Sequence, residues 1–137
     1  MKYLLDTNIL SELIKKRPSP HLRARLASTP QRSLVTSCVC VMELRLGSAL
    51  RKDFEAFWQK ISEEILSRVG ILPLDLDVAL AAGDLLARLR ATGRPISIED
   101  ILIASTALTH QCILVTANIR HFQPIEELST ENWLEPT

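Results

Sequence analysis

The stretch Tyr3-Leu4-Leu5-Asp6-Thr7-Asn8 places an acidic side chain at the end of a short apolar run. Three apolar or aromatic residues in succession are typical of a strand buried on both faces, as in a parallel sheet. The next apolar residues have helical spacing: Ile9, Leu10, Leu13 and Ile14. This order predicts that Asp6 lies at the carboxyl end of a strand, where α/β proteins bind ligands. Alternatively, Asp6 only caps the following helix.

Strand-like and helix-like segments alternate along the rest of the chain. Strand patterns cover residues 33–37, 71–74 and 112–116, and a last short strand is expected around Ile125. Helical patterns cover 21–28, a segment containing Glu43, 54–69, a segment from Asp75 or Asp77 to Thr92, and 99–111. The sequence therefore predicts an α/β fold: a single domain of residues 1–137, built as a three-layer α/β/α sandwich with a mainly parallel sheet of about five strands. Pro73 favours an edge position for the third strand, and the helices around Glu43 and 54–69 are expected to form a hairpin.

Charge is balanced over the whole chain but unevenly distributed. The 16 basic and 16 acidic residues give a formal net charge of zero, which provides no global argument for nucleic acid or membrane binding. Residues 2–32 hold seven basic side chains against two acids, whereas the segment from Gln123 onward has four Glu and no Lys or Arg. The basic segment either binds phosphates or is simply a solvated surface.

The location of the protein is predicted from what the sequence lacks. No apolar run is long enough to span a membrane, and no leader peptide is recognised at Met1. The cysteines Cys38, Cys40 and Cys112 are odd in number and do not have zinc-site spacing, so buried thiols in a reducing compartment are expected. We expect a cytoplasmic protein.

Two further acids lie on helix faces that look apolar. Neighbours three and four positions from Glu43 are Val39, Cys40, Leu46 and Gly47. Asp100 is followed on its helix face by Ile103, Ala104 and Ala107, with no basic residue within a turn. A buried unpaired carboxylate costs several kcal/mol, so a partner is expected for both acids. Asp84 shows that the pattern alone is not specific, because it also has apolar neighbours but has Arg88 four positions later.

A divalent cation would neutralise the acids. Asp6 follows the first predicted strand, Glu43 lies in the helix after the second, and Asp100 opens the helix before the strand at Ile113, so a parallel sheet could bring them to one edge. Three carboxylates would repel one another without a metal, and Mg²⁺ or Mn²⁺ prefers oxygen ligands. Such a site suits phosphodiester hydrolysis by metal-activated water. The sequence contains no phosphate-binding P-loop, dinucleotide-binding or hydrolase-elbow motif.

Two other classes of function are weighed against hydrolysis. In a non-catalytic binding module, the acids would hold a structural cation or a partner's Arg. A phosphatase of the haloacid-dehalogenase kind also begins with an Asp after its first strand, but it needs a second acid as proton donor where this chain has Asn8. His121 shares a loop with Asn118 and Arg120 and could add a fourth polar group to the site.

Four blocks of sequence resemble the PIN domains, and among them the VapC-type ribonuclease toxins of toxin–antitoxin pairs. The blocks, in order, are Leu5-Asp6-Thr7-Asn8-Ile9-Leu10, Met42-Glu43-Leu44 with Gly47, Asp100-Ile101-Leu102-Ile103-Ala104, and Val115-Thr116-Ala117-Asn118 with Arg120-His121-Phe122. Asn132-Trp133 also resembles the way such chains finish. Each block is weak by itself, and the four together span nearly the whole chain.

The resemblance implies a toxin that is a Mg²⁺- or Mn²⁺-dependent endoribonuclease. Asp6, Glu43 and Asp100 match the acidic metal-binding and catalytic residues, and Asn118 matches the fourth catalytic position. Positions that orient the acids through hydrogen bonds are matched by Thr7, Asn8 and Thr116. Glu99 is unusual beside Asp100 and is interpreted as peripheral.

The resemblance also implies partners. They are an RNA substrate, a second copy of the chain in a homodimer, and a cognate antitoxin that inserts a C-terminal segment near the acids. DNA would be reached only indirectly, through the antitoxin. Basic side chains near the N-terminus are candidate RNA contacts, together with one in the last block: Lys15, Lys16, Arg17, Arg23, Arg25 and Arg120.

Overall fold

A computed structural model describes residues 1–136, whose strands form one sheet. The strands are β1 (Lys2–Leu5), β2 (Leu34–Ser37), β3 (Gly70–Leu72), β4 (Cys112–Val115) and β5 (Thr130–Glu131). They form a five-stranded sheet in the order β3-β2-β1-β4-β5, and each neighbouring pair is parallel. The first strand is therefore the central one. The edge position predicted from Pro73 is confirmed, because Pro73 directly follows the edge strand β3.

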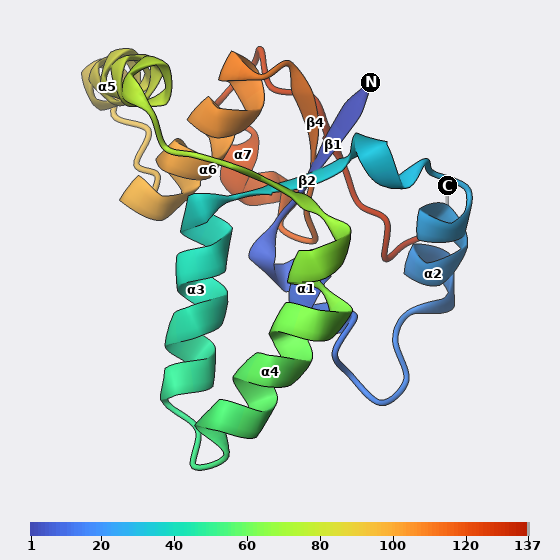
Figure 1. The fold of residues 1–137 in the computed structure, drawn as a ribbon. Coiled ribbons are helices and arrows are strands. Elements are labelled where there is room, and N and C mark those ends of the chain that lie inside the picture. Colours follow the sequence, from blue (N-terminus) through green and yellow to red (C-terminus); the bar gives the residue numbers. More distant parts are fainter. Residues whose placement is uncertain (137) are drawn as a thin grey trace.

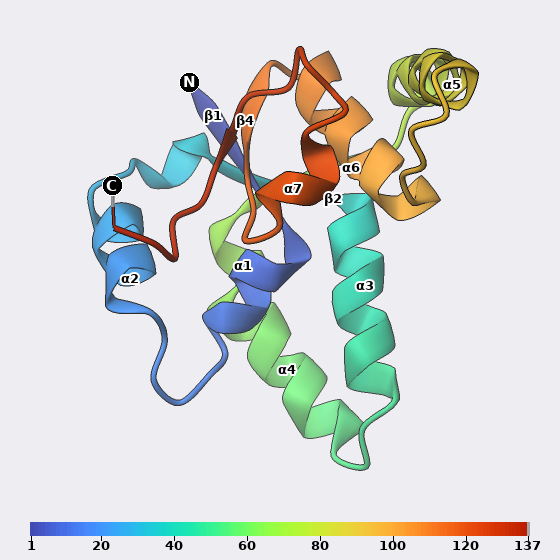
Figure 2. The same ribbon diagram turned by 180° about the vertical axis from the view of Figure 1, so that it is seen from behind.

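Helices cover both faces of the sheet, which confirms the predicted α/β/α sandwich (Figures 1 and 2). They are α1 (Thr7–Glu12), α2 (Pro20–Ala27), α3 (Cys38–Ala49), α4 (Phe54–Glu64), α5 (Leu76–Ala91), α6 (Ile98–Thr109) and α7 (Ile119–Phe122), with short 3-10 turns at Gln31–Ser33 and Leu66–Arg68. Figure 1 shows α3 and α4 as the expected helical hairpin, which extends away from the sheet. Helices α5 and α6 pack against each other. No helix within residues 1–136 is long and apolar enough to cross a membrane.

Capping side chains set the starts of several helices. The Ser37 hydroxyl accepts a hydrogen bond from the Cys40 backbone N–H at the start of α3. Ser97 caps α6 in the same way, accepting from the N–H of Asp100. Each cap satisfies a backbone donor that the helix itself leaves unpaired. The caps fix where Glu43 and Asp100 lie relative to the strands.

The central strand is buried as its sequence predicts. Leu4 and Leu5 of β1 and Leu114 of β4 are almost fully inaccessible and belong to one continuous apolar core. Aliphatic side chains fill most of this core, with Phe122 and Trp133 as its largest members. Burial of this kind is the main stabilising contribution to the fold. It also holds the carboxyl end of β1, and hence Asp6, in a fixed position.

Three local predictions are wrong. The last strand is Thr130–Glu131, and Ile125 instead lies in a turn, where its N–H donates to the Phe122 carbonyl. Ile125 is buried, so its apolar character reflects the core and not a strand. The predicted helix 54–69 ends as an α-helix at Glu64. Cys38 is exposed, whereas Cys40 and Cys112 are buried as expected, because Cys38 lies on the outer face of α3.

Candidate metal centre

Asp6 is fixed by both its backbone and its side chain. Its N–H donates to the carbonyl of Val115 on β4 at 2.9 Å. Its carboxylate is 5% exposed; Oδ1 accepts from the Thr7 N–H at 2.7 Å, and Oδ2 accepts from the Thr116 hydroxyl at 2.8 Å. Asp6 is also the residue that caps α1. The two interpretations of Asp6, cap and site residue, are therefore compatible.

Asn8 and Thr116 hold Asp6 from the side of β4. The Asn8 side-chain amide donates to Asp6 Oδ2 and to the Thr116 hydroxyl, each at 3.4 Å. Its oxygen accepts from the Ala117 N–H at 3.0 Å, and the Asn118 N–H donates to the Thr116 hydroxyl at 3.0 Å. Short polar side chains from both ends of the chain thus restrict the carboxylate to one orientation.

Glu43 reaches the same region from α3. Its Oε1 accepts from the Thr7 hydroxyl at 2.7 Å. The predicted apolar surroundings are only half correct, because Cys40 is buried whereas Leu46 and Gly47 are exposed. Glu43 consequently lies at the rim of the core, with a partly exposed side chain.

The sequence reasoning missed a thiol in this cluster. Ligand atoms of Asp6, Cys40 and Glu43 all lie within 4.8 Å of one another. Cys40 Sγ is 3.9 Å from Asp6 Oδ1 and accepts from the Ser37 hydroxyl at 3.3 Å. Burial, and secondarily the charge of Asp6, raises the pKa of the Cys40 thiol. The signal was available in the spacing, since Cys40 precedes Glu43 by three residues and therefore shares its helix face.

Asp100, in the first turn of α6, belongs to the same electrostatic cluster. Burial is the main cause that raises the pKa of Asp6, and the charge of Asp100 adds to it. Burial also raises the pKa of Glu43, with further contributions from Asp6, Asp100 and Glu99. The His121 Nδ1 atom is 3.5 Å from Asp100 Oδ2. The structure thus gathers the three predicted acids into one region of negative charge.

The donor set of this cluster fits a hard divalent cation. Three carboxylates from β1, α3 and α6 supply oxygen ligands, which Mg²⁺ and Mn²⁺ prefer. The raised pKa values of Asp6 and Glu43 show that the fold holds these charges at a cost, which a cation would offset. We therefore treat the cluster as a candidate metal centre, and the individual roles of its residues stay predictions.

The remaining predicted site residues are Asn118, Arg120 and Glu99, and all three are exposed. Asn118 is exposed and precedes α7, with its backbone N–H bonded to Thr116, and Arg120 is exposed on α7. Glu99 is exposed beside Asp100. These positions form the surface that adjoins the acids on the β4 side.

The basic segment is not uniformly free to bind phosphate. Lys16 and Arg17 are exposed in the loop between α1 and α2, and Lys15 is exposed but pairs with Glu12 at 3.3 Å. Other members of the predicted set are Arg23, which is exposed, and Arg25, which is half-buried. The Arg25 guanidinium pairs with Glu131 at 2.8 Å and stacks on Trp133, so a phosphate would have to compete with these contacts.

The control acid also differs from its prediction. Arg88 pairs with Glu127 through two contacts of 2.6 and 2.7 Å. Asp84 is exposed to solvent and needs no partner there. Apolar neighbours in the sequence therefore did not indicate burial at Asp84, because Leu80 and Ala87, which share its face of α5, are themselves exposed.

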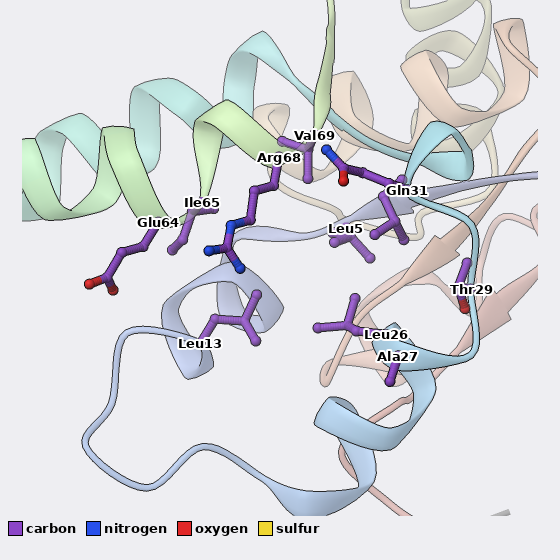
Figure 3. A pocket seen from close by; sticks show the side chains of 11 residues that line it. Leu5, Leu13, Leu26, Ala27, Thr29, Gln31, Glu64, Ile65, Arg68 and Val69 are labelled. Atoms are coloured by element: carbon purple, nitrogen blue, oxygen red, sulfur yellow. The ribbon is translucent and has the colours of Figure 1, made fainter.

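A groove of about 590 Å³ is separate from the acidic cluster, since Asp6, Glu43 and Asp100 do not line it. Leu13, Leu26 and Ile65 line it, the Arg68 side chain extends into it, and Glu64 points away from it (Figure 3). Figure 3 shows that the groove is bounded by segments from α1, α2 and α4. Leu5 also lines it, so the groove reaches the residue directly before Asp6.

Comparison with known proteins gives a consistent result over nearly the whole chain. The family described as the PIN domain matches residues 3–127. The chain is 36% identical over 134 residues to "Ribonuclease VapC2" of Haemophilus influenzae, covering 98% of this chain and 99% of the relative. It is 34% identical over 133 residues to the "tRNA(fMet)-specific endonuclease VapC" of Shigella flexneri, covering 97% and 98%.

Solved structures agree with the sequence matches. The crystal structure of DNA-bound VapBC from Salmonella typhimurium contains a chain that superposes with a TM-score of 0.88 and 31% identity, covering 97% of this chain and 98% of that one. By its sequence and its fold, the chain belongs to the PIN domain family, within the group that contains the VapC ribonucleases.

Proposed function

We propose that this chain is a metal-dependent endoribonuclease, using Mg²⁺ or Mn²⁺, that acts as the toxin of a toxin–antitoxin pair in the cytoplasm. The observation that carries the proposal is that ligand atoms of Asp6, directly after β1, and Glu43, on α3, lie within 4.8 Å of each other. Asp100 on α6 is near enough for its charge to raise the pKa of both. The relatives named as ribonucleases support the same activity. They give no support to a non-catalytic binding module.

The proposed mechanism assigns a task to each group of residues. Asp6, Glu43 and Asp100 would hold the cation, which when bound supplies an activated water and polarises the phosphoryl group. Thr7 and Thr116 keep the carboxylates of Glu43 and Asp6 in fixed orientations through bonds of 2.7 and 2.8 Å. Preorganised oxygen ligands do not have to reorient during the reaction, which is how such centres lower the barrier.

Asn118 would complete the centre on the β4 side. Its side chain is exposed, and its backbone is tied to Thr116, whose hydroxyl also contacts Asp6. An amide in this position adds an oxygen without adding negative charge. The substrate strand would then lie along the exposed surface of Asn118 and Arg120, where the guanidinium can contact a phosphate.

Cleavage of RNA tests the activity directly. We expect cleavage of an RNA pool in Mg²⁺ or Mn²⁺, loss of cleavage in EDTA, and a loss of about 100-fold or more in the Asp100→Asn variant, because one acidic ligand is removed. Asp84→Asn is the matched control, since it removes an exposed acid from the neighbouring helix and should retain activity. Cleavage that persists in EDTA, or in folded Asp100→Asn, would refute the metal-dependent mechanism.

The groove beside Leu5 is the surface that we propose for the antitoxin. Leu13, Leu26 and Ile65 give it apolar walls, Arg68 and Glu64 add charge, and Leu5, the residue before Asp6, also lines it. A hydrophobic groove with charged side chains suits an amphipathic segment of a partner protein. The structure titled DNA-bound VapBC is consistent with DNA contact made through that partner. Leu26→Glu should weaken co-purification with the co-expressed antitoxin while RNA cleavage is retained.

A homodimer is proposed from a different surface. Met42, Leu46 and Leu50 repeat at intervals of four residues along α3, and all three are exposed. On α5, Leu76 and Leu80 are exposed at the same spacing. Residues four apart share one face of a helix, so each helix presents an apolar strip to solvent. A second copy of the chain would bury these strips.

A further inference from the structure

The thiol of Cys40 is a ligand-type side chain beside Asp6 that the proposed Mg²⁺ chemistry does not use. Cys40 is 0% exposed, and its sulfur faces Asp6 Oδ1 at 3.9 Å. The ligand atoms of Asp6, Cys40 and Glu43 are all within 4.8 Å of one another. Mg²⁺ selects oxygen, whereas zinc-like cations also bind thiolate sulfur. The cluster therefore contains two overlapping sets of donor atoms. Its carboxylate oxygens alone suit Mg²⁺, and the same oxygens together with the Cys40 sulfur suit a zinc-like cation.

The spacing of this second donor set matches a zinc-like ion. With Zn–S bonds of about 2.3 Å and Zn–O bonds of about 2.0–2.2 Å, a tetrahedral ion separates its sulfur and oxygen ligands by roughly 3.5 Å. The sulfur and the Asp6 oxygen are 3.9 Å apart, so a shift of a few tenths of an ångström is sufficient. Glu43 is partly exposed, and the Thr7 hydroxyl holds only its Oε1, which leaves the second carboxylate oxygen to bind the ion.

We propose that Cys40 is a sulfur ligand for thiophilic divalent cations such as Zn²⁺ and Cd²⁺, which bind with Asp6 and Glu43 and exclude Mg²⁺ from the centre. On binding, the S–H bond of Cys40 breaks, a sulfur–metal bond forms, and the proton passes to water, with no change of oxidation state. The consequence for activity rests on the proposed function: Zn²⁺ would inhibit cleavage that Mg²⁺ supports.

Cadmium absorption tests the proposal without RNA. The variant C38S/C112S retains Cys40 as its only thiol. Titration of this protein with Cd²⁺ should produce ultraviolet sulfur-to-cadmium charge-transfer absorption that saturates at one ion per chain. Excess Mg²⁺ should weaken the apparent Cd²⁺ affinity, because both ions need Asp6 and Glu43. The absence of the absorption, or an affinity that Mg²⁺ does not change, would overturn the proposal.

Removal of the thiol gives the second measurement. Adding C40S to the same background should abolish the absorption and weaken Cd²⁺ binding, measured by calorimetry, by roughly tenfold or more, because even indirect supports of metal ligands contribute 10–100-fold. Circular dichroism verifies the fold, and if C40S does not fold, the titration of C38S/C112S with Mg²⁺ competition still decides the question. Unchanged calorimetric affinity in folded C40S would contradict the proposal.

The two proposals can fail separately. Protein that binds Cd²⁺ through Cys40 but cleaves no RNA in Mg²⁺ would contradict the proposed function and support the thiol ligand. Protein that cleaves RNA but shows no Cd²⁺ absorption would do the reverse.

Discussion

Replacing Asp6 with Asn should stabilise the metal-free fold at neutral and alkaline pH. Asp6 is 5% exposed, and its ligand oxygen lies within 4.8 Å of that of Glu43. An asparagine retains an oxygen to accept from the Thr7 N–H. Its amide can donate to the Thr116 hydroxyl oxygen, provided that this hydroxyl turns its proton away. The substitution thus removes the charge while conserving the shape and most of the hydrogen bonds.

The magnitude follows from the repulsion between the carboxylates. Two charges 4.8 Å apart repel by about 3 kcal/mol at an effective dielectric constant of about 20. Solvent screening at the partly exposed Glu43, and the weaker hydrogen bonds of a neutral amide, reduce the net gain to about 1 to 2 kcal/mol. For a chain of this size, that corresponds to a rise in Tm of roughly 3 to 8 °C.

The pH dependence has a definite sign. Burial raises the pKa of Asp6 in the folded chain above the ordinary 3.8. The stability that the protonated Asp6 carboxyl contributes is therefore full below pH 3.8. It is lost as the pH rises through the raised pKa of Asp6 in the folded chain. The amide introduced by the substitution does not titrate, so the Tm advantage of Asp6→Asn should grow from acid to neutral pH. Mg²⁺ should raise the Tm of the parent chain and have a smaller effect on the variant.

Thermal unfolding in EDTA from pH 4 to pH 8 measures the effect. Asp84→Asn is the control, because Asp84 is exposed and its substitution should change Tm by little at any pH. An Asp6→Asn variant that is destabilised equally across the whole pH range would refute the reasoning, since it would show that hydrogen bonding at Asp6 outweighs charge repulsion.

Three further predictions concern the surface. The double variant Lys16→Ala/Arg17→Ala should weaken RNA binding. In titrations at several ionic strengths, it should lower the slope of log K against log salt by about 1 to 2. An unchanged slope would exclude this loop from the RNA interface. Leu46→Lys should shift a dimer toward monomer in light scattering, because it places a charge in the apolar strip of α3, and retained dimer mass would locate the interface elsewhere. Arg88→Ala should lower the free energy of unfolding only slightly in denaturant at pH 7, because the pair is solvent-exposed. Arg88 holds the pKa of Glu127 at about 2, so the loss of stability in Arg88→Ala should be present above pH 4.5 and vanish as the pH falls toward 2. A loss of stability that does not change with pH would contradict this prediction.

The sheet and the positions of the acids could be predicted because they depend on local sequence. Buried parallel strands consist of short apolar runs, and β1, β2 and β4 each have one. Asp6 follows β1 directly, so the strand alone specifies its place. The helix caps at Ser37 and Ser97 are also local features. For these elements, the residues that determine the structure lie within the same short stretch of chain.

The features that the sequence did not reveal depend on contacts between distant segments. Nothing near Arg25 indicates that it pairs with Glu131, or that Arg88 pairs with Glu127 instead of Asp84. Ile125 was assigned to a strand because apolar character indicates burial but not conformation. Cys40 was noted as a neighbour of Glu43, but its contact with Asp6 requires the packing of α3 against β1, which spacing does not specify.

The central position of β1 has a consequence for synthesis on the ribosome. β1 is translated first, yet one of its two neighbours, β4, is translated more than 100 residues later, and the bond from Thr116 to Asp6 spans 110 residues. Closing so long a loop is entropically costly, and such pairings form late in folding. A nascent chain that ends just before Cys112 already contains Asp6, Glu43 and Asp100, but it has no β4 to hold Asp6 in place. The acidic centre can therefore form only after β4 has been synthesised, which keeps a nuclease of this architecture inactive while the residues before β4 are translated.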